Sequence, residues 1–452
     1  MNFDSVFVIG CFLPLIVCLY WLLQKDSWRN GLLLIAGLAF YAFGSFSGLF
    51  LLLLAIAVNF CMGLWLQKIE RRKLLCGITV AANLLFLCAY KYLNFFLGAE
   101  TVSLVAPVGI SFFTFKCISY IVDICRDPSK GTKNIFRFAL YVSFFPQITA
   151  GPITRFEQFG SQLTTGRSMQ VPEGLRRFVV GLGKKLILSG TLAQITDGVF
   201  ATTAPDARLA WLGALAYMLQ IYFDFSGYSD MAIGVGQLFG FYTPENFNHP
   251  YIAGSITDFW RRWHISLSTW FKDYLYIPLG GNRKGKFRAA LNKAIVFTLC
   301  GLWHGANWTF LIWGAWHGVL SALESIKKIA PKKLLGKILA HTYALLAVCL
   351  GFVMFRADNV QQGFAMIGAM FTGFSCNVVN TVTFHTLLNA ESICIMALSI
   401  VLCLPWVQWL KKREVWYRKL EPVSWILCLV LFALCLLKLA SGGFAPFIYF
   451  QF

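Results

Sequence analysis

Residues 32–66 read LLLIAGLAFYAFGSFSGLFLLLLAIAVNFCMGLWL and contain no charged side chain. A helix that crosses a bilayer needs about 20 consecutive apolar residues. Further apolar runs occur at 6–23, 296–317 and 424–437. Only 13% of the 452 residues are charged, whereas soluble domains usually contain about 25%. The chain is therefore predicted to be a polytopic membrane protein.

The predicted fold class is all-α, with a single membrane domain over residues 1–452. The length criterion gives roughly 11 to 13 membrane segments, some of them short or interrupted by Gly and Pro. Such interrupted segments are expected to be re-entrant, which a bilayer tolerates where protein or water covers the backbone. The first apolar run lacks the basic region and cleavage site of a signal peptide, so it is expected to be a retained first helix.

The net charge of +19 does not indicate nucleic-acid binding. The Lys and Arg residues form short clusters between apolar runs, as at 67–73 and 411–413. Cationic loops of this kind stay on the cytoplasmic side of a membrane, whereas a nucleic-acid interface is a continuous basic stripe. Placing the clusters inside puts the N-terminus and the aromatic tail at 442–452 on the exterior. The fourteen cysteines form no CxxC pair, so they are expected to be small apolar side chains rather than metal or redox ligands.

Residues 247–292 combine repeated Trp and Tyr with charged side chains. Thr257 and Asp258 are typical of a helix start before the aromatic run. The composition suits an amphipathic helix that lies at the membrane surface or packs into the mouth of a cavity.

Three of the six histidines fall close together in the chain: His264 in WRRWH, His304 in GLWHGA and His317 in WGAWHG. An ionisable residue at membrane depth is costly and usually marks a site or a pathway. Imidazole also suits proton transfer near neutral pH. Gly305 and Gly318 would let other backbone or substrate approach closely. We expect a functional role for His304 and a structural or supporting role for His317.

The remaining histidines carry weaker signals. His249 and His385 are expected in loops, and His341 near a membrane interface. A metal site built from His264 and His304 lacks the usual ligand spacings, so no metal is expected.

Two further segments place polar groups in apolar surroundings. The sequence YFDFSGYSD at 222–230 contains Asp224 and Asp230, and buried carboxylates need partners. Arg261 and Arg262 are the expected partners, and a purely structural ion pair is at least as well supported as a catalytic one. The sequence FFPQITAGPITR at 144–155 is expected to be a broken or re-entrant stretch that lines a cavity.

Taken together, these motifs resemble the membrane-bound O-acyltransferase (MBOAT) family, in its bacterial branch that acetylates alginate and other polysaccharides. The resemblance spans nearly the whole chain and is firmest from about Pro107 onward. It rests on the segments already quoted and on VGISFFTF at 108–115, ISY at 118–120, FRA at 355–357 and PFIYF at 446–450.

The resemblance implies a ring of tilted helices around a tunnel that admits the acyl donor from one side and the acceptor from the other. The family's catalytic histidine falls on His304, and its second functional histidine falls on His264. The side chains expected to shape the substrate tunnel are Trp303, Asp224, Asp230, Gln147, Arg262 and His317.

The implied activity is transfer of an acetyl group from cytoplasmic acetyl-CoA, across the bacterial inner membrane, to hydroxyls of an exported polysaccharide. The transfer is direct or passes through a periplasmic acyl-receiving protein, and no bound cofactor is expected. His304 would act as a neutral base toward the attacking hydroxyl. Two alternatives stay open: D-alanyl transfer from a carrier protein toward teichoic acid, and a proton-coupled transporter that uses the buried His and Asp residues as a proton pathway.

Overall fold

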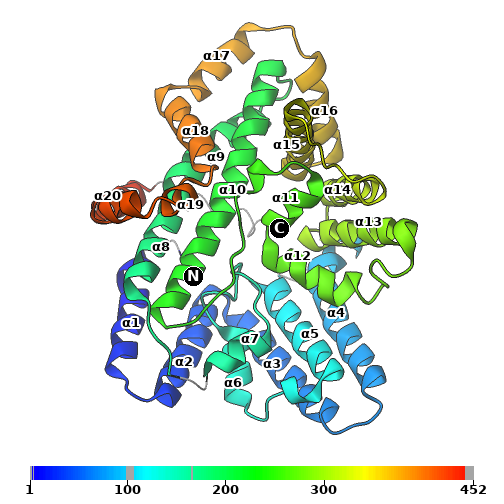
Figure 1. Cartoon of the computed structure of the whole chain (residues 1–452), viewed down its shortest axis with the longest axis vertical. Helices are drawn as coiled ribbons and strands as arrows, with labels where there is room; N and C mark the ends of the chain where they lie inside the picture. The colour runs from blue at the N-terminus through cyan, green and yellow to red at the C-terminus, as the bar shows by residue number, and fades with distance from the viewer. Residues whose placement is uncertain (1–2, 4, 98–105, 164–165, 443–452) are drawn as a thin grey trace. The chain divides into compact units, whose positions relative to one another are not determined.

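Every regular element in the described part of the chain is a helix, as the sequence predicts (Figure 1). The computed structural model describes residues 3, 5–97, 106–163 and 166–442. Nearly all of the aromatic tail that was predicted to face the exterior lies outside these residues. The described residues form two compact units.

The first unit consists of Met1–Phe178 and Tyr228–Glu245. Its elements up to α8 are η1 (Val8–Phe12), α1 (Leu13–Leu22), α2 (Asp26–Gly44), α3 (Phe46–Leu66), α4 (Arg72–Leu97), α5 (Ile110–Arg126), η2 (Pro128–Lys130), α6 (Ile135–Ser143), α7 (Phe156–Gly160) and η3 (Ser161–Leu163). Helices α8 (Val171–Gly183) and α10 (Ala207–Leu238) contribute residues to both units.

The second unit consists of Val179–Gly227 and Asn246–Phe452. Its other elements are η4 (Lys184–Ser189), α9 (Gly190–Phe200), η5 (Pro250–Ile252), α11 (Ile256–Arg262), α12 (Ile265–Phe271), η6 (Lys272–Tyr276), α13 (Gly285–His304), α14 (Trp308–Ile326), α15 (Leu334–Arg356), α16 (Val360–Thr372), α17 (Val378–Leu387), α18 (Ala390–Leu402), α19 (Trp406–Lys411) and α20 (Glu414–Ala440). The expectation that His385 lies in a loop is wrong. Asn377 accepts a hydrogen bond from the backbone N–H of Asn380 at 2.7 Å and starts α17, whose last turn contains His385.

Five helical stretches of the described residues are long and apolar enough to cross a bilayer, or six if the bent pair α17–α18 is one span. They are Phe46–Leu66, Arg72–Leu93, Val171–Phe200, Leu334–Arg356 and Lys419–Ala440. The multi-pass membrane class is therefore confirmed. The larger number expected from the sequence also counted short and broken segments, which fold here as shorter, bent or more polar helices. The ring around a tunnel and the single domain stay predictions.

The apolar run at 296–317 folds as two helices, α13 and α14, that lie side by side (Figure 1). Their backbones touch where glycines face each other. A Cβ atom added to Gly301 would lie 2.3 Å from the Phe310 carbonyl oxygen, and one added to Gly314 would lie 2.5 Å from the Phe297 carbonyl oxygen. A Cβ atom added to Gly318 would lie 3.0 Å from the Ala294 carbonyl oxygen. Any larger residue at these contacts would push the two helices apart.

The aromatic segment after residue 247 packs inside the second unit. Ser255 starts α11, because its hydroxyl accepts a hydrogen bond from the backbone N–H of Asp258 at 3.0 Å. The predicted helix start is therefore correct to within two residues. Trp260, Trp263 and Trp270 are all buried, so the aromatic face covers the protein interior and is not an exposed surface.

The predicted broken segment at 144–155 is confirmed as a stretch without helix between α6 and α7. Almost all of it is buried. Pro146 and Pro152 cannot donate backbone hydrogen bonds, and the segment is held instead by side chains. Tyr141 at the end of α6 donates from its hydroxyl to the Thr154 carbonyl at 3.0 Å.

Candidate active site

His304 is the last residue of α13 and is 4% exposed. Aromatic rings surround it: the ring of Trp303 lies 4.8 Å away, that of Trp313 5.1 Å and that of Phe355 5.1 Å between centroids. The carboxyl end of a helix carries partial negative charge. A proton taken up by His304 would therefore be stabilised by α13, while the aromatic rings exclude water.

His317 is the tenth residue of α14 and is completely buried. Its ring is 5.2 Å from that of Trp313, so Trp313 contacts the rings of both His304 and His317. The indole N–H of Trp260 donates to Nδ1 of His317 at 3.4 Å, which leaves the imidazole proton on Nε2. Nε2 points at the backbone of Gly351, where an added Cβ would lie only 2.7 Å away. These contacts favour the supporting role expected for His317.

His264 lies between α11 and α12 in a left-handed backbone conformation, with φ 43° and ψ 55°. This conformation is uncommon for a residue with a side chain, and it persists where surrounding contacts impose it. Two backbone hydrogen bonds do so here. The Asn248 N–H donates to the Arg262 carbonyl and the Ile265 N–H to the Asn246 carbonyl, both at 2.9 Å.

The side chain of Asn246 fixes the imidazole of His264. Its Oδ1 accepts hydrogen bonds from the backbone N–H of Ser266 at 3.2 Å and from the Ser266 hydroxyl at 2.9 Å, and it lies 3.1 Å from Nδ1 of His264. A carboxamide oxygen only accepts, so Nδ1 must be the donor. Nδ1 therefore carries the proton, and Nε2 keeps its lone pair.

His264 lies outside the helices that are long and apolar enough to cross a bilayer. Burial lowers the pKa of its imidazole to about 3. The neutral form is therefore populated near neutral pH, as base or acceptor chemistry requires. The ring of Phe225 packs edge-on against it at 4.6 Å.

Asp224 forms a buried ion pair with Lys185. The Lys185 ammonium donates to Oδ1 of Asp224 at 2.7 Å, and both side chains are at most 3% exposed. The expectation that Arg261 and Arg262 pair with the buried carboxylates is wrong. Arg262 instead pairs with Asp258 on the same helix, at 3.0 Å. Side chains four residues apart lie next to each other on a helix surface.

Asp230 and Gln147 belong to the first unit. Arg177 donates to Asp230 from Nε at 3.0 Å and also binds Glu245. The partner of Asp230 is therefore Arg177 on α8, and not Arg261 or Arg262 as expected.

Gln147 lies at the centre of a buried polar network in the broken segment. Its Oε1 accepts from the Lys116 ammonium at 3.2 Å and from the Thr154 hydroxyl at 2.8 Å, and its Nε2 donates to Thr243 at 3.1 Å. Lys116 was not singled out in the sequence, although a lysine within an apolar run signals a buried polar site.

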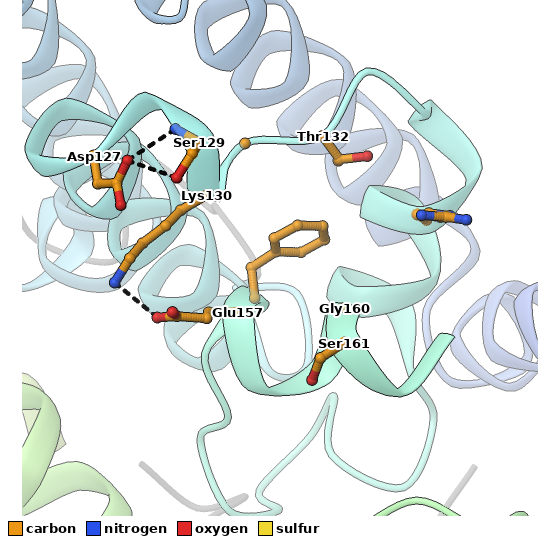
Figure 2. Close-up of a pocket in the computed structure, with 10 residues that line it drawn as sticks. Asp127, Ser129, Lys130, Thr132, Glu157, Gly160 and Ser161 are labelled. Atoms are coloured by element: carbon orange, nitrogen blue, oxygen red, sulfur yellow. Dashed lines mark hydrogen bonds and ion pairs between the residues drawn. The ribbon is translucent and has the colours of Figure 1, made fainter. Parts of the chain in front are cut away.

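A small open pocket of about 290 Å³ occurs in the first unit (Figure 2). Two of its charged side chains have close partners: Lys130 pairs with Glu157 at 2.8 Å, and Asp127 accepts from the Ser129 hydroxyl at 2.7 Å. The hydrogen bond to Glu157 raises the pKa of Lys130, and the hydroxyl of Ser129 lowers the pKa of Asp127. The pocket contains no histidine, so the aromatic-enclosed histidines of the second unit are the stronger candidates for catalysis. No group of three His, Cys, Asp or Glu side chains that could hold a metal ion occurs among the described residues.

Residues 113–327, which include His264 and His304, match the model of the membrane-bound O-acyltransferase family. The chain is also 38% identical, over its whole length and that of the relative, to a probable alginate O-acetylase, AlgI, of Pseudomonas putida. The chain belongs to the membrane-bound O-acyltransferase family. The resemblance of its motifs to that family is thereby confirmed.

Two other members show the range of named activities. The peptidoglycan O-acetyltransferase of Helicobacter pylori is 33% identical over 100% of this chain and 97% of its own length. The teichoic acid D-alanyltransferase of Bacillus subtilis is 31% identical over 56% of this chain and 69% of its own length. This membrane-bound O-acyltransferase thus aligns along its whole length with the two O-acetyl-transferring relatives.

The Lys185–Asp224 pair tests whether Asp224 is structural. Lys185→Met leaves a buried carboxylate without its cation, which typically costs about 3–5 kcal/mol, so the melting temperature should fall sharply. The double variant Lys185→Met/Asp224→Leu should recover most of that loss. Thermal unfolding in detergent measures both. A double variant as unstable as the sum of its single changes would contradict a pairwise structural role.

Proposed function

We propose that this chain transfers acetyl groups from acetyl-CoA to hydroxyls of an exported polysaccharide, with His304 as the general base. The single observation that supports this most is the alignment of the whole chain with a probable alginate O-acetylase. The buried, aromatic-enclosed His304 lies within the segment that matches the family model. The catalytic role that the family resemblance implies for this residue is part of the proposal.

The chemistry that we propose is a single acyl transfer. The acceptor hydroxyl loses its proton to the imidazole of His304 while its oxygen attacks the thioester carbonyl, and the carbon–sulfur bond then breaks. The proton passes from the imidazolium to the departing thiolate. The helix end at His304 stabilises the imidazolium by about 0.3–2 kcal/mol.

The oxyanion that forms in this step needs hydrogen-bond donors. Trp313 is our candidate, because its ring lies 5.1 Å from that of His304. Its buried indole N–H has no hydrogen-bond acceptor among the residues that the structure describes. A donor that is already oriented and dry is worth more to a transition state than one in water.

His264 is proposed to orient the donor or the acceptor through Nε2. Asn246 then acts as a positioning residue, since it sets both the tautomer and the ring orientation of His264. His317, Trp303 and Asp224 would shape and support the surroundings of the two histidines.

The proposed donor is on the cytoplasmic face and the proposed acceptor on the outer face of the bacterial inner membrane. A periplasmic protein that receives the acetyl group is the proposed partner, unless the polysaccharide is modified directly. The second candidate function is D-alanyl transfer from a carrier protein, because a teichoic acid D-alanyltransferase is among the relatives.

Donor use separates these activities. Purified protein in detergent should release CoA from acetyl-CoA when an oligosaccharide acceptor is present, and no D-alanyl carrier protein should be needed. Free thiol release measures the reaction. Charged carrier protein consumed in place of acetyl-CoA would support the D-alanyl alternative. Proton-coupled flux in liposomes that is unaffected by acyl donors would support a transporter.

The role of Asn246 predicts a graded effect. Asn246→Ala should lower kcat on the order of 100-fold, because a small misplacement of a reacting group is that costly. Asn246→Asp keeps the acceptor oxygen and should restore much of the activity. Because its carboxylate favours the imidazolium, the acid limb of the pH–rate profile should move to higher pH.

The matched control is Asn248→Ala, since Asn248 uses its backbone N–H in the same segment. This variant should behave like the wild type. Equal losses in the Ala and Asp variants of Asn246, with an unchanged pH profile, would indicate that Asn246 is needed only for folding.

A further inference from the structure

Arg167 is a buried cation that forms no ion pair with any other described residue. It lies between η3 and α8 in the first unit and is 9% exposed. None of its three guanidinium nitrogens meets an acceptor in hydrogen-bonding geometry within the described residues. Its guanidinium lies over the ring of Phe241 at 4.4 Å and at 6.0 Å from that of Tyr20.

The aromatic rings attract the cation, but they do not satisfy its five N–H donors. The Tyr20 hydroxyl interacts with Arg167, and it donates its own hydrogen bond to the Phe239 carbonyl at 2.8 Å. It can accept from at most one or two of the five donors. Leaving charged donors buried and unpaired is expensive, so the arrangement points to an anion that completes it.

The backbone around Arg167 is held in place. Gly240 has a φ of +75°, and a Cβ there would lie 2.8 Å from the Cβ of Arg167. The Gln170 N–H donates to the Gln237 carbonyl at 3.0 Å. The Asn30 side chain donates to the Leu163 carbonyl at 3.3 Å on the other side. Arg167 is therefore positioned by contacts on both sides of its segment.

A second cation lies beside the same tyrosine. Arg29 at the start of α2 is 5.0 Å from the Tyr20 ring, and its side chain is 16% exposed. Its Nε donates to the Leu23 carbonyl at 2.8 Å. The Asp26 carboxylate is 3.8 Å from Nη1 of Arg29, which is beyond hydrogen-bond length. Two guanidinium groups thus lie near the Tyr20 ring, and the Asp26 carboxylate is loosely placed beside one of them.

The residues around Arg29 are of the kind found at a membrane interface. Tyr20 is near the end of α1, where Leu22 is 77% and Trp21 50% exposed, and Trp28 on α2 is 65% exposed. Exposed tryptophans next to basic residues are typical of the headgroup level of a bilayer. Leu15, one to two turns earlier on α1, is also exposed and can contact an acyl chain.

We propose that Arg167 and Arg29 bind the phosphate of a phospholipid whose acyl chains lie along the exposed face of α1. Guanidinium groups match phosphate with paired, charge-assisted hydrogen bonds, and basic pockets at membrane helices select anionic headgroups. The site is independent of acyl transfer. The lipid phosphate provides the buried guanidinium of Arg167 with a counter-charge.

The test uses the purified full-length protein in detergent and short-chain dioctanoyl phosphatidylglycerol. This lipid should raise the melting temperature of the wild type, because a ligand that binds only the folded state stabilises it. Dioctanoylglycerol, which has the same chains without the phosphate, should not. Arg167→Gln should bind the lipid at least tenfold more weakly, while its lipid-free melting temperature should be no lower than that of the wild type.

Arg29→Gln should weaken binding to a smaller extent, and it carries the test if Arg167→Gln does not fold. The matched control is Arg71→Gln, an exposed arginine of the same unit, which should bind like the wild type. The proposal is overturned if Arg167→Gln loses lipid-free stability but keeps the lipid response, or if Arg29→Gln binds unchanged. It is also overturned if CoA or inorganic phosphate, but not the phospholipid, stabilises the protein.

Discussion

The backbone contact between α13 and α14 is the constraint on which the histidine site depends. Gly301 and Gly314 allow two helices to touch where any side chain would separate them. The contact brings the end of α13, with His304, against the aromatic face of α14. Such an enclosure suits the proposed base, because dry surroundings strengthen each electrostatic interaction at the reacting atoms.

A second principle governs the polar groups of this chain: among the described residues, nearly every buried or half-buried charge has a partner close by. Lys185 neutralises Asp224, Arg177 neutralises Asp230, and Lys116 is held by Gln147 and a backbone carbonyl. A protein with apolar side chains in place of such an ion pair is often as stable as the protein with the pair. Where charges do occur in a membrane interior, they need partners, because an unpaired charge is costly there. Arg167 departs from this pattern, and that departure is the reason to expect a ligand beside it.

The sequence predicted the class of the fold because apolar run length and charge placement are direct consequences of the bilayer. It also predicted the broken segment at 144–155 and the start of α11, since proline and helix caps act locally. It failed for the partners of Asp224 and Asp230, which lie on η4 and α8 respectively, because pairing across distant segments leaves no local signal. The same reason hid Asn246, which acts 18 residues away from His264. The burial of His304 was expected from its apolar neighbours, but its enclosure by Phe355 was not.

The central claim is that His304 performs proton transfer during acetyl transfer, and CoA release by matched histidine variants tests it most directly. His304→Ala should lose at least 100-fold in kcat while keeping the wild-type melting temperature to within a few degrees. His385→Ala, which removes an exposed imidazole of the same unit, should be as active as the wild type. Equal CoA release by the wild type and by folded His304→Ala protein would contradict the account.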